Sequence, residues 1–160
     1  MNFDKSPKKL LFKREARAEL LKGVKKLADA VSITMGPGGH TVVIDMGSDK
    51  FPILTKDGVT VAKSVNLPDR MQNLGAQIVK QAAQGSAEIA GDGTTTSTVI
   101  AYHLFAKGVK AVNAGTNPVL MRKGMVTCAE EIITELSKTA KPVKTDEEII
   151  QVGTLSLIHI

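Results

Sequence analysis

The sequence predicts a mainly α-helical domain with one small β hairpin, and three observations lead to this prediction. Long segments repeat their apolar residues at intervals of three and four, which is the period of an amphipathic helix. Only two short runs are rich in β-branched residues, and they lie close together in the chain. The chain has one tyrosine, four phenylalanines and no tryptophan, so its core must be aliphatic, which favours helix packing.

The first helix is expected from about residue 13. Its apolar residues recur at intervals of three and four from Ala16 to Val31, opposite a charged face. The helix should end before Gly36-Pro37-Gly38-Gly39, because this run is a strong stop and turn signal. Residues 1–9, which precede the helix, are interpreted as a flexible tail.

A single hairpin is expected next. Residues 41–45 form a short β-branched strand, and residues 53–55 form the return strand. Gly47-Ser48-Asp49 supplies the bend between them. Because an exposed hairpin of this size is only marginally stable alone, we expect it to pair with another element.

Five further helices complete the prediction, although the first and last are short. They begin near residue 59, at Leu67-Pro68-Asp69, after the glycine-threonine stretch near residue 93, at Asn117-Pro118 and at the capping-box pattern Thr145-Asp146-Glu147-Glu148. We expect buried faces on the three long ones. These faces carry Met71, Leu74, Ile78, Val79 and Ala82; Val99, Ile100, Leu104, Val109 and Val112; and Met121, Val126, Ala129, Ile132, Ile133 and Leu136.

Composition excludes some classes of protein and leaves others open. Cys128 is the only cysteine, which excludes an intramolecular disulfide, and its apolar neighbours predict a small buried hydrophobe. No apolar run approaches the ~20 residues of a membrane span. The net charge is +5, and much of it lies within residues 1–26. This basic run is typical of a solvated helix face or a partner surface, and a nucleic-acid footprint is the alternative.

The stretch Ala90-Gly91-Asp92-Gly93-Thr94-Thr95-Thr96-Ser97-Thr98-Val99 has two interpretations. In the first, Asp92 caps a helix and the threonines only cover the surface. In the second, the glycines allow close approach of a phosphate to the N-terminus of the helix, and Asp92 supplies an oxygen ligand for Mg²⁺. The decapeptide alone does not decide between them.

Three glycine-containing turns lie at element boundaries, where binding groups commonly sit on a helical scaffold. They are Thr34-Met35-Gly36-Pro37, Thr55-Lys56-Asp57-Gly58 and Asp92-Gly93-Thr94-Thr95-Thr96. Together they offer carbonyls, hydroxyls, a lysine and two carboxylates, a set that suits a nucleoside triphosphate with its metal ions. The standard phosphate-loop patterns are absent from the sequence. For Lys56 and Asp57, a solvated turn with a helix cap is the alternative.

With these turns in place, the chain resembles the N-terminal part of a group I chaperonin, the bacterial GroEL type, over about residues 10–154. The matching segments agree with that family in order and in approximate spacing. They are Leu27-Ala28-Asp29-Ala30-Val31, Thr34-Met35-Gly36-Pro37, Thr55-Lys56-Asp57-Gly58-Val59-Thr60-Val61-Ala62, Asn73-Leu74-Gly75-Ala76, Ala90-Gly91-Asp92-Gly93-Thr94-Thr95-Thr96, Gly115-Thr116-Asn117-Pro118 and Gln151-Val152-Gly153-Thr154.

The resemblance implies a helical equatorial domain that binds ATP, Mg²⁺ and K⁺ in a machine that refolds unfolded polypeptides. Within that domain it assigns Asp57 to the catalytic acid cluster that positions the attacking water, and Asp92 to Mg²⁺. Thr34, Lys56 and Thr95 are implied as K⁺ ligands. The full set implied to bind the nucleotide is Thr34, Met35, Gly36, Pro37, Lys56, Asp92, Gly93, Thr94, Thr95 and Thr96.

The partners that the resemblance implies are those of a cytoplasmic homo-oligomer with two seven-membered rings. They include a co-chaperonin and unfolded client proteins, and the hairpin at residues 41–55 resembles the element that pairs with a neighbouring subunit. One departure affects this contact. After Pro37 the family usually has Lys-Gly-Arg, whereas this chain has Gly38-Gly39-His40, so two cations near the ring contact are lost.

The end of the sequence departs further from the family, which continues through intermediate and apical domains. Residues 155–160 look like the translation of a transposase mosaic-end adapter used for sequencing libraries, and a diverged tail that ends in an apolar strand is the alternative. We therefore expect a partial equatorial domain over 10–154 and a genuine sequence that ends near Thr154, which resequencing of the locus would check. We also expect the chain alone to bind ATP weakly and to hydrolyse it negligibly. A small basic nucleic-acid-binding module is the alternative function.

Overall fold

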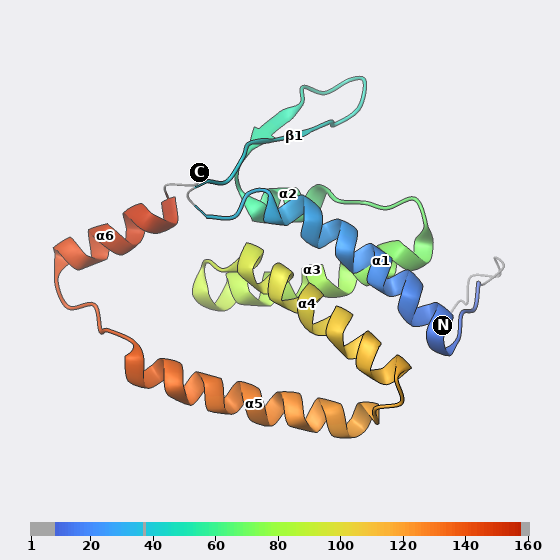
Figure 1. Ribbon diagram of the computed structural model, residues 1–160. Coiled ribbons are helices and arrows are strands. Elements are labelled where there is room, and N and C mark those ends of the chain that lie inside the picture. The colour runs from blue at the N-terminus through green and yellow to red at the C-terminus, as the bar shows by residue number, and fades with distance from the viewer. Residues whose placement is uncertain (1–8, 37, 158–160) are drawn as a thin grey trace, which may run out of the picture.

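A computed structural model describes residues 9–36 and 38–157, with side chains described to residue 154. Most of the predicted tail at 1–9, Pro37 and the last residues of the segment 155–160 lie outside the described residues. The order of elements is α1 (Lys13–Ser32), β1 (Val42–Ile44), β2 (Ile53–Thr55), α2 (Gly58–Ser64), α3 (Arg70–Ala90), α4 (Thr94–Asn113), α5 (Pro118–Thr139) and α6 (Asp146–Leu157) (Figure 1). The prediction of a mainly helical fold with one hairpin is confirmed.

The core lies where α1 packs against α3 and α4, with the short helix α2 against the C-terminal half of α1 (Figure 1). Its side chains are aliphatic, as the composition predicts, and Leu27 and Val31 of α1 have no exposed surface. The cluster of buried residues consists of Val24, Leu27, Val31, Val61, Ala62, Ala76 and Val79.

Two glycines allow α1 and α3 to cross at backbone contact. A Cβ on Gly23 would lie 1.8 Å from the carbonyl oxygen of Gln72, and one on Gly75 would lie 2.3 Å from the carbonyl oxygen of Leu20. Real Cβ atoms do not approach other atoms this closely. The face of α3 that packs here is therefore made of small residues centred on Gly75, Ala76 and Ala83.

This close crossing explains why part of the predicted packing of α3 is wrong. Val79 is buried as predicted, but Leu74, Ile78 and Ala82 are exposed, because the contact face is turned toward the small residues. In α4, Val109 is buried as predicted, whereas Ile100 and Leu104 lie on its exposed side. The sequence period located these helices correctly but misplaced their contact faces.

The hairpin is a two-stranded antiparallel sheet that extends away from the helices (Figure 1). Val43 pairs with Leu54, and both side chains are exposed, as is Phe51 in the connecting loop. In the described part of the chain, β1 and β2 pair only with each other. The predicted hairpin is thus present and leaves two strand edges and several apolar side chains in solvent.

Helices α5 and α6 form an arc that leaves the helical core (Figure 1). Their ends are well specified: Asn117 caps α5, and the predicted capping box between Thr145 and Glu148 is present at α6. The predicted inward face of α5 is nevertheless wrong, because α5 has no buried residue and its aliphatic side chains are exposed. Cys128 is exposed for the same reason, which corrects the expectation of a buried thiol.

None of the helices within residues 9–36 and 38–157 is both long enough and apolar enough to cross a membrane.

Candidate functional site

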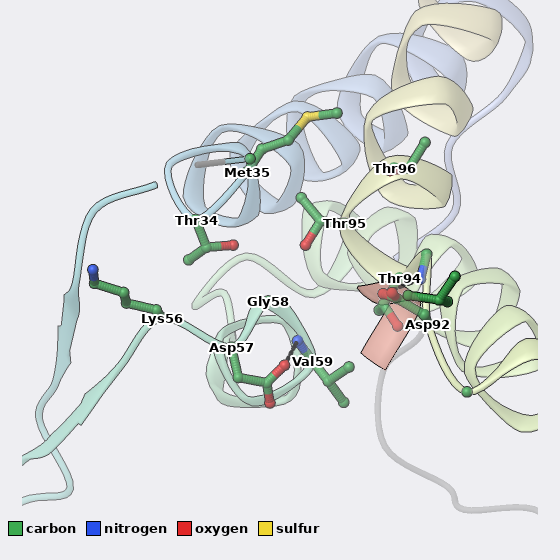
Figure 2. A pocket seen from close by; sticks show the side chains of 14 residues that line it. Thr34, Met35, Lys56, Asp57, Gly58, Val59, Asp92, Thr94, Thr95 and Thr96 are labelled. Atoms are coloured by element: carbon green, nitrogen blue, oxygen red, sulfur yellow. Dashed lines mark hydrogen bonds between the residues drawn. The ribbon is translucent and has the colours of Figure 1, made fainter. Parts of the chain in front are cut away.

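The three glycine-containing turns meet around one cleft of about 450 Å³ (Figure 2). The turn after α1, the turn between β2 and α2, and the loop between α3 and α4 each contribute one wall. Residues that line the cleft are Thr34, Met35, Gly36, Lys56, Asp57, Gly58, Val59, Gly91, Asp92, Gly93, Thr94, Thr95, Thr96 and Val152. The structure therefore brings together every described residue that sequence analysis assigned to the site, and Pro37 lies outside the described residues.

The first wall follows the end of α1, where the chain turns at Thr34. The buried Thr34 hydroxyl donates to the carbonyl oxygen of Val31 at 2.8 Å, which holds the turn against the last helical residues. Gly36 has φ +72°, a left-handed conformation that glycine adopts without steric cost. The turn closes when the N–H of His40 donates to the carbonyl oxygen of Ile33 at 2.9 Å.

The second wall is organised by Asp57, which caps α2. One carboxylate oxygen accepts from the N–H of Val59 at 3.0 Å, and the other accepts from the N–H and hydroxyl of Thr60 at 2.9 and 2.6 Å. Partial burial works to raise the pKa of Asp57, but these hydrogen bonds and nearby Lys63 outweigh it and lower the pKa below its usual range. Asp57 is therefore ionised at neutral pH.

Gly58 holds the three walls in contact. A Cβ on this residue would lie 2.0 Å from the hydroxyl oxygen of Thr95 and 3.1 Å from that of Thr34. Figure 2 shows these two hydroxyls pointing toward each other beside Gly58. The N-terminus of α2 thus approaches α4 and the end of α1 at a distance that only glycine permits.

The third wall is the loop Gly91–Gly93 and the first turn of α4. Gly91 and Gly93 are both left-handed, with φ values of +71° and +82°, so the chain reverses within three residues. In one of the two interpretations of this stretch Asp92 caps α4, but the N-cap is Gly93, and Asp92 instead accepts from the N–H of Gly93 at 2.6 Å. The left-handed glycines place Asp92 one residue before the cap, at the cleft.

Some lining residues were missed by sequence analysis as site residues. Gly58, Val59 and Gly91 lie within the quoted motifs, so their neighbours already marked their position. Val152 reaches the cleft from α6, and its place in the segment Gln151-Val152-Gly153-Thr154 was the only signal for it. No local pattern predicts that a residue so far along the chain lines the same cleft as Asp57 and Asp92.

The oxygen ligands at the cleft suit a metal ion that binds together with a polyphosphate better than a metal ion held by protein side chains alone. Among the described residues, no group of three or more His, Cys, Asp or Glu side chains could hold a metal. The cleft does contain the carboxylates of Asp57 and Asp92, with the hydroxyls of Thr94 and Thr95. Mg²⁺ commonly takes one or two carboxylates and completes its shell with phosphate oxygens and water.

The basic residues of α1, which suggested the nucleic-acid alternative, bond largely within the molecule. The bonds join helices or neighbouring turns, so they orient the cations along the protein surface. Arg17 donates to Asn113, Lys26 to Gln72, Lys22 to Glu19 and Lys25 to Asp29. This arrangement is that of a solvated helix face with internal partners.

Residues 27–158, which include all three turns, match the family described as the TCP-1/cpn60 chaperonin family. The chain belongs to the TCP-1/cpn60 chaperonin family. A solved structure with a similar fold is the chaperonin gp146 from the bacteriophage EL 2 (Pseudomonas aeruginosa), determined in the presence of ATP-BeFx. The TM-score is 0.67 and the sequence identity 30%, over 81% of this chain and 22% of gp146. This chaperonin chain thus spans about a fifth of the length of gp146.

Proposed function

We propose that the cleft binds ATP with Mg²⁺ and that the chain belongs to an ATP-dependent protein-folding chaperonin of the group I type. The observation that carries the proposal is the meeting of three separate turns, with carboxylates and hydroxyls, around one cleft. The presence of an ATP analogue with the similar chaperonin gp146 supports it. Residues 10–154 would form part of an equatorial ATP-binding domain.

In this proposal the loop after α3 and the first turn of α4 hold the phosphates. The N-cap of α4 is Gly93, which has no side chain to accept from the first-turn N–H groups, whereas Asp57 and Asp69 cap α2 and α3 with their carboxylates. The N–H groups of this turn suit phosphate oxygens, and the helix dipole favours negative charge there. The hydroxyls of Thr94, Thr95 and Thr96 add further donors.

The remaining walls hold the nucleotide and its cations. Thr34, Met35 and Gly36 would line the nucleotide, and Pro37, which lies outside the described residues, is proposed to bind it as well. Asp92 would bind Mg²⁺, which neutralises charge on the phosphates when bound. We propose that K⁺ binds near Thr34, Lys56 and Thr95. The hydroxyls of Thr34 and Thr95 face each other at the cleft (Figure 2).

Asp57 is proposed to orient the attacking water in hydrolysis. Its hydrogen bonds hold the carboxylate in a fixed position at the N-terminus of α2. Because its pKa is lowered, Asp57 stays ionised and accepts a hydrogen bond from water, but it is a weak base at neutral pH. Its role is therefore to position the water, and the developing charge has to be stabilised by other groups.

For partners we propose a cytoplasmic homo-oligomeric ring, with a co-chaperonin and unfolded polypeptides as further partners. The hairpin supports the ring contact, because its strands pair only with each other among the described residues and expose Val43, Leu54 and Phe51. A strand from a neighbouring subunit would satisfy the backbone edge and cover these side chains.

Calorimetric titration of the full chain with ATP, with and without Mg²⁺, tests the nucleotide proposal. We expect weak binding that strengthens when Mg²⁺ is present, and we expect Asp92→Ala to remove this strengthening. Asp49→Ala is the matched control, because Asp49 is an exposed aspartate of the hairpin loop outside the cleft. Binding that ignores Mg²⁺, or that survives unchanged in Asp92→Ala, would contradict the proposal.

A further inference from the structure

Lys80 of α3 reaches across to the C-terminal end of α2. Its ammonium donates to the carbonyl oxygen of Val65 and to that of Lys63, the latter at 3.3 Å. The side chain is partly buried, and burial lowers the pKa of Lys80. The last carbonyls of a helix have no partner within the helix and carry the negative end of its dipole, so a cation suits this position.

The helix that Lys80 holds is short and enters the cleft at its other end. α2 has seven residues, and its N-cap is Asp57. Val61 and Ala62 pack into the core, and Gly58 holds the N-terminal end of α2 close to Thr95 and Thr34. The hydrogen bonds from Lys80 hold the opposite, C-terminal end, because their length and angle are restricted.

The position of Lys80 also ties α2 to the helix that leads to Asp92. α3 continues from Lys80 to Ala90 and then enters the Gly91–Gly93 loop. At 1.5 Å per residue, Lys80 lies roughly 15 Å from the end of α3, and Lys63 lies roughly 9 Å from Asp57. Lys80 is therefore too far from the cleft to contact a ligand and acts through the two helices.

We propose that Lys80 is a positioning residue that sets the separation of Asp57 and Asp92 and thereby the Mg²⁺-dependent affinity for nucleotide. This inference rests on the proposed function, since it assigns both carboxylates to the Mg·ATP site. Asp57 is the N-cap of α2, Asp92 follows the end of α3, and Lys80, in the middle of α3, bonds that helix to the C-terminal end of α2. Loss of a partner that bonds a metal ligand directly commonly costs about 10- to 100-fold in affinity, so for Lys80, which acts through α2 and α3, we expect the lower end of this range.

The test compares Lys80→Met with Lys80→Arg in the full chain. Lys107→Met is the matched control, because Lys107 is an exposed lysine of α4 that does not line the cleft. We expect Lys80→Met to weaken Mg·ATP binding about tenfold while ATP binding without Mg²⁺ changes little. Lys80→Arg, which retains a cationic donor, should restore most of the lost affinity. Lys80→Gln replaces Lys80→Met if circular dichroism shows that the latter does not fold.

The hydrogen bonds by which Lys80 holds the C-terminal end of α2, here called the clamp, can be tested independently of the proposed function. The test is hydrogen exchange without nucleotide. We expect the amides of Val61 in α2 and of its C-cap Val65 to exchange faster in Lys80→Met than in the parent chain. Faster exchange with unchanged Mg·ATP affinity would overturn the positioning role and leave the proposed function standing. Unchanged exchange in α2 would overturn the clamp itself. If the parent chain itself shows no Mg²⁺-dependent binding of ATP, the proposed function is overturned, and the inference with it.

Discussion

Helices α3 and α5 have almost the same length, 21 and 22 residues, but they relate differently to the rest of the molecule. α3 packs through a face of small residues that meets the backbone of α1 at Gly75. α5 carries larger aliphatic side chains, among them Ile133 and Leu136, and buries none of them. An apolar stripe therefore predicts that a helix has a contact face, and whether that face is covered depends on other parts of the structure.

The surface of the molecule shows the consequence of this difference. A compact monomer of 17.0 kDa exposes about 7,700 Å² by the usual scaling with mass. This structure exposes 12088 Å². The arc formed by α5 and α6 and the extended hairpin account for the open shape in Figure 1. Such exposed apolar surface is typical of an interaction site or of a tendency to aggregate.

The same substitution in the two helices gives the largest expected contrast. Gly75→Ala should lower the free energy of unfolding by about 3 kcal/mol, because the new methyl group would meet the carbonyl of Leu20 and force α1 and α3 apart. Gly124→Ala in α5 meets no atom within 4 Å and should strengthen that helix by about 1 kcal/mol at most. Urea unfolding followed by circular dichroism measures both. Similar losses in the two variants would mean that α5 is packed as tightly as α3.

Acid should destabilise the core, through the Asp57 cap of α2, more than it destabilises α6. This difference should be smaller than the one between the two glycine variants. The folded pKa of Asp57 lies below its unfolded value of about 3.9, so its contribution is complete above that pH and disappears as the pH falls through the folded pKa. Hydrogen bonds from the N–H groups of Lys144 and Thr145 likewise lower the pKa of Glu148 in α6. Loss of the Asp57 cap should cost about 1 kcal/mol of global stability, because α2 belongs to the core.

The measurement is the midpoint of urea unfolding between about pH 2.5 and 7, across the carboxylate range. Asp57→Asn should lower the urea midpoint at neutral pH. In this variant the midpoint should also decrease less between neutral and acid pH than in the parent chain. Glu148→Gln should change neither, because residues 146–154, the part of α6 whose side chains the structure describes, contribute nothing to the core cluster. A fall of the global midpoint in Glu148→Gln as large as that in Asp57→Asn would show that α6 unfolds together with the core.

The sequence predicted the elements and the grouping of the site better than it predicted packing. Caps and glycine turns are local signals, so the ends of α3, α5 and α6 and the three turns at the cleft could be located. The contact face of α3 could not, because it follows from the approach of Leu20 to Gly75, which no local pattern records. The roles of Asp57 and Asp92 toward a nucleotide stay predictions.

Two other points have a similar physical origin. The interpretation in which Asp92 caps α4 does not hold, because left-handed glycines flank Asp92 and the helix begins one residue later, with Gly93 as its N-cap. Cys128 was expected to be buried because its neighbours are apolar, but burial needs an element to cover α5. Local sequence thus fixes a conformation more reliably than it fixes the neighbours of a residue.

Hydrogen–deuterium exchange of the full chain, with and without Mg·ATP, tests most directly whether the three turns form one site. We predict that Mg·ATP slows exchange together in residues 34–36, 56–60 and 91–98, and leaves α5 unchanged. The coincidence of three segments is the decisive feature, because they are far apart in sequence and meet only at the cleft. Protection confined to one of these segments, or protection that appears in α5 instead, would contradict a shared nucleotide site.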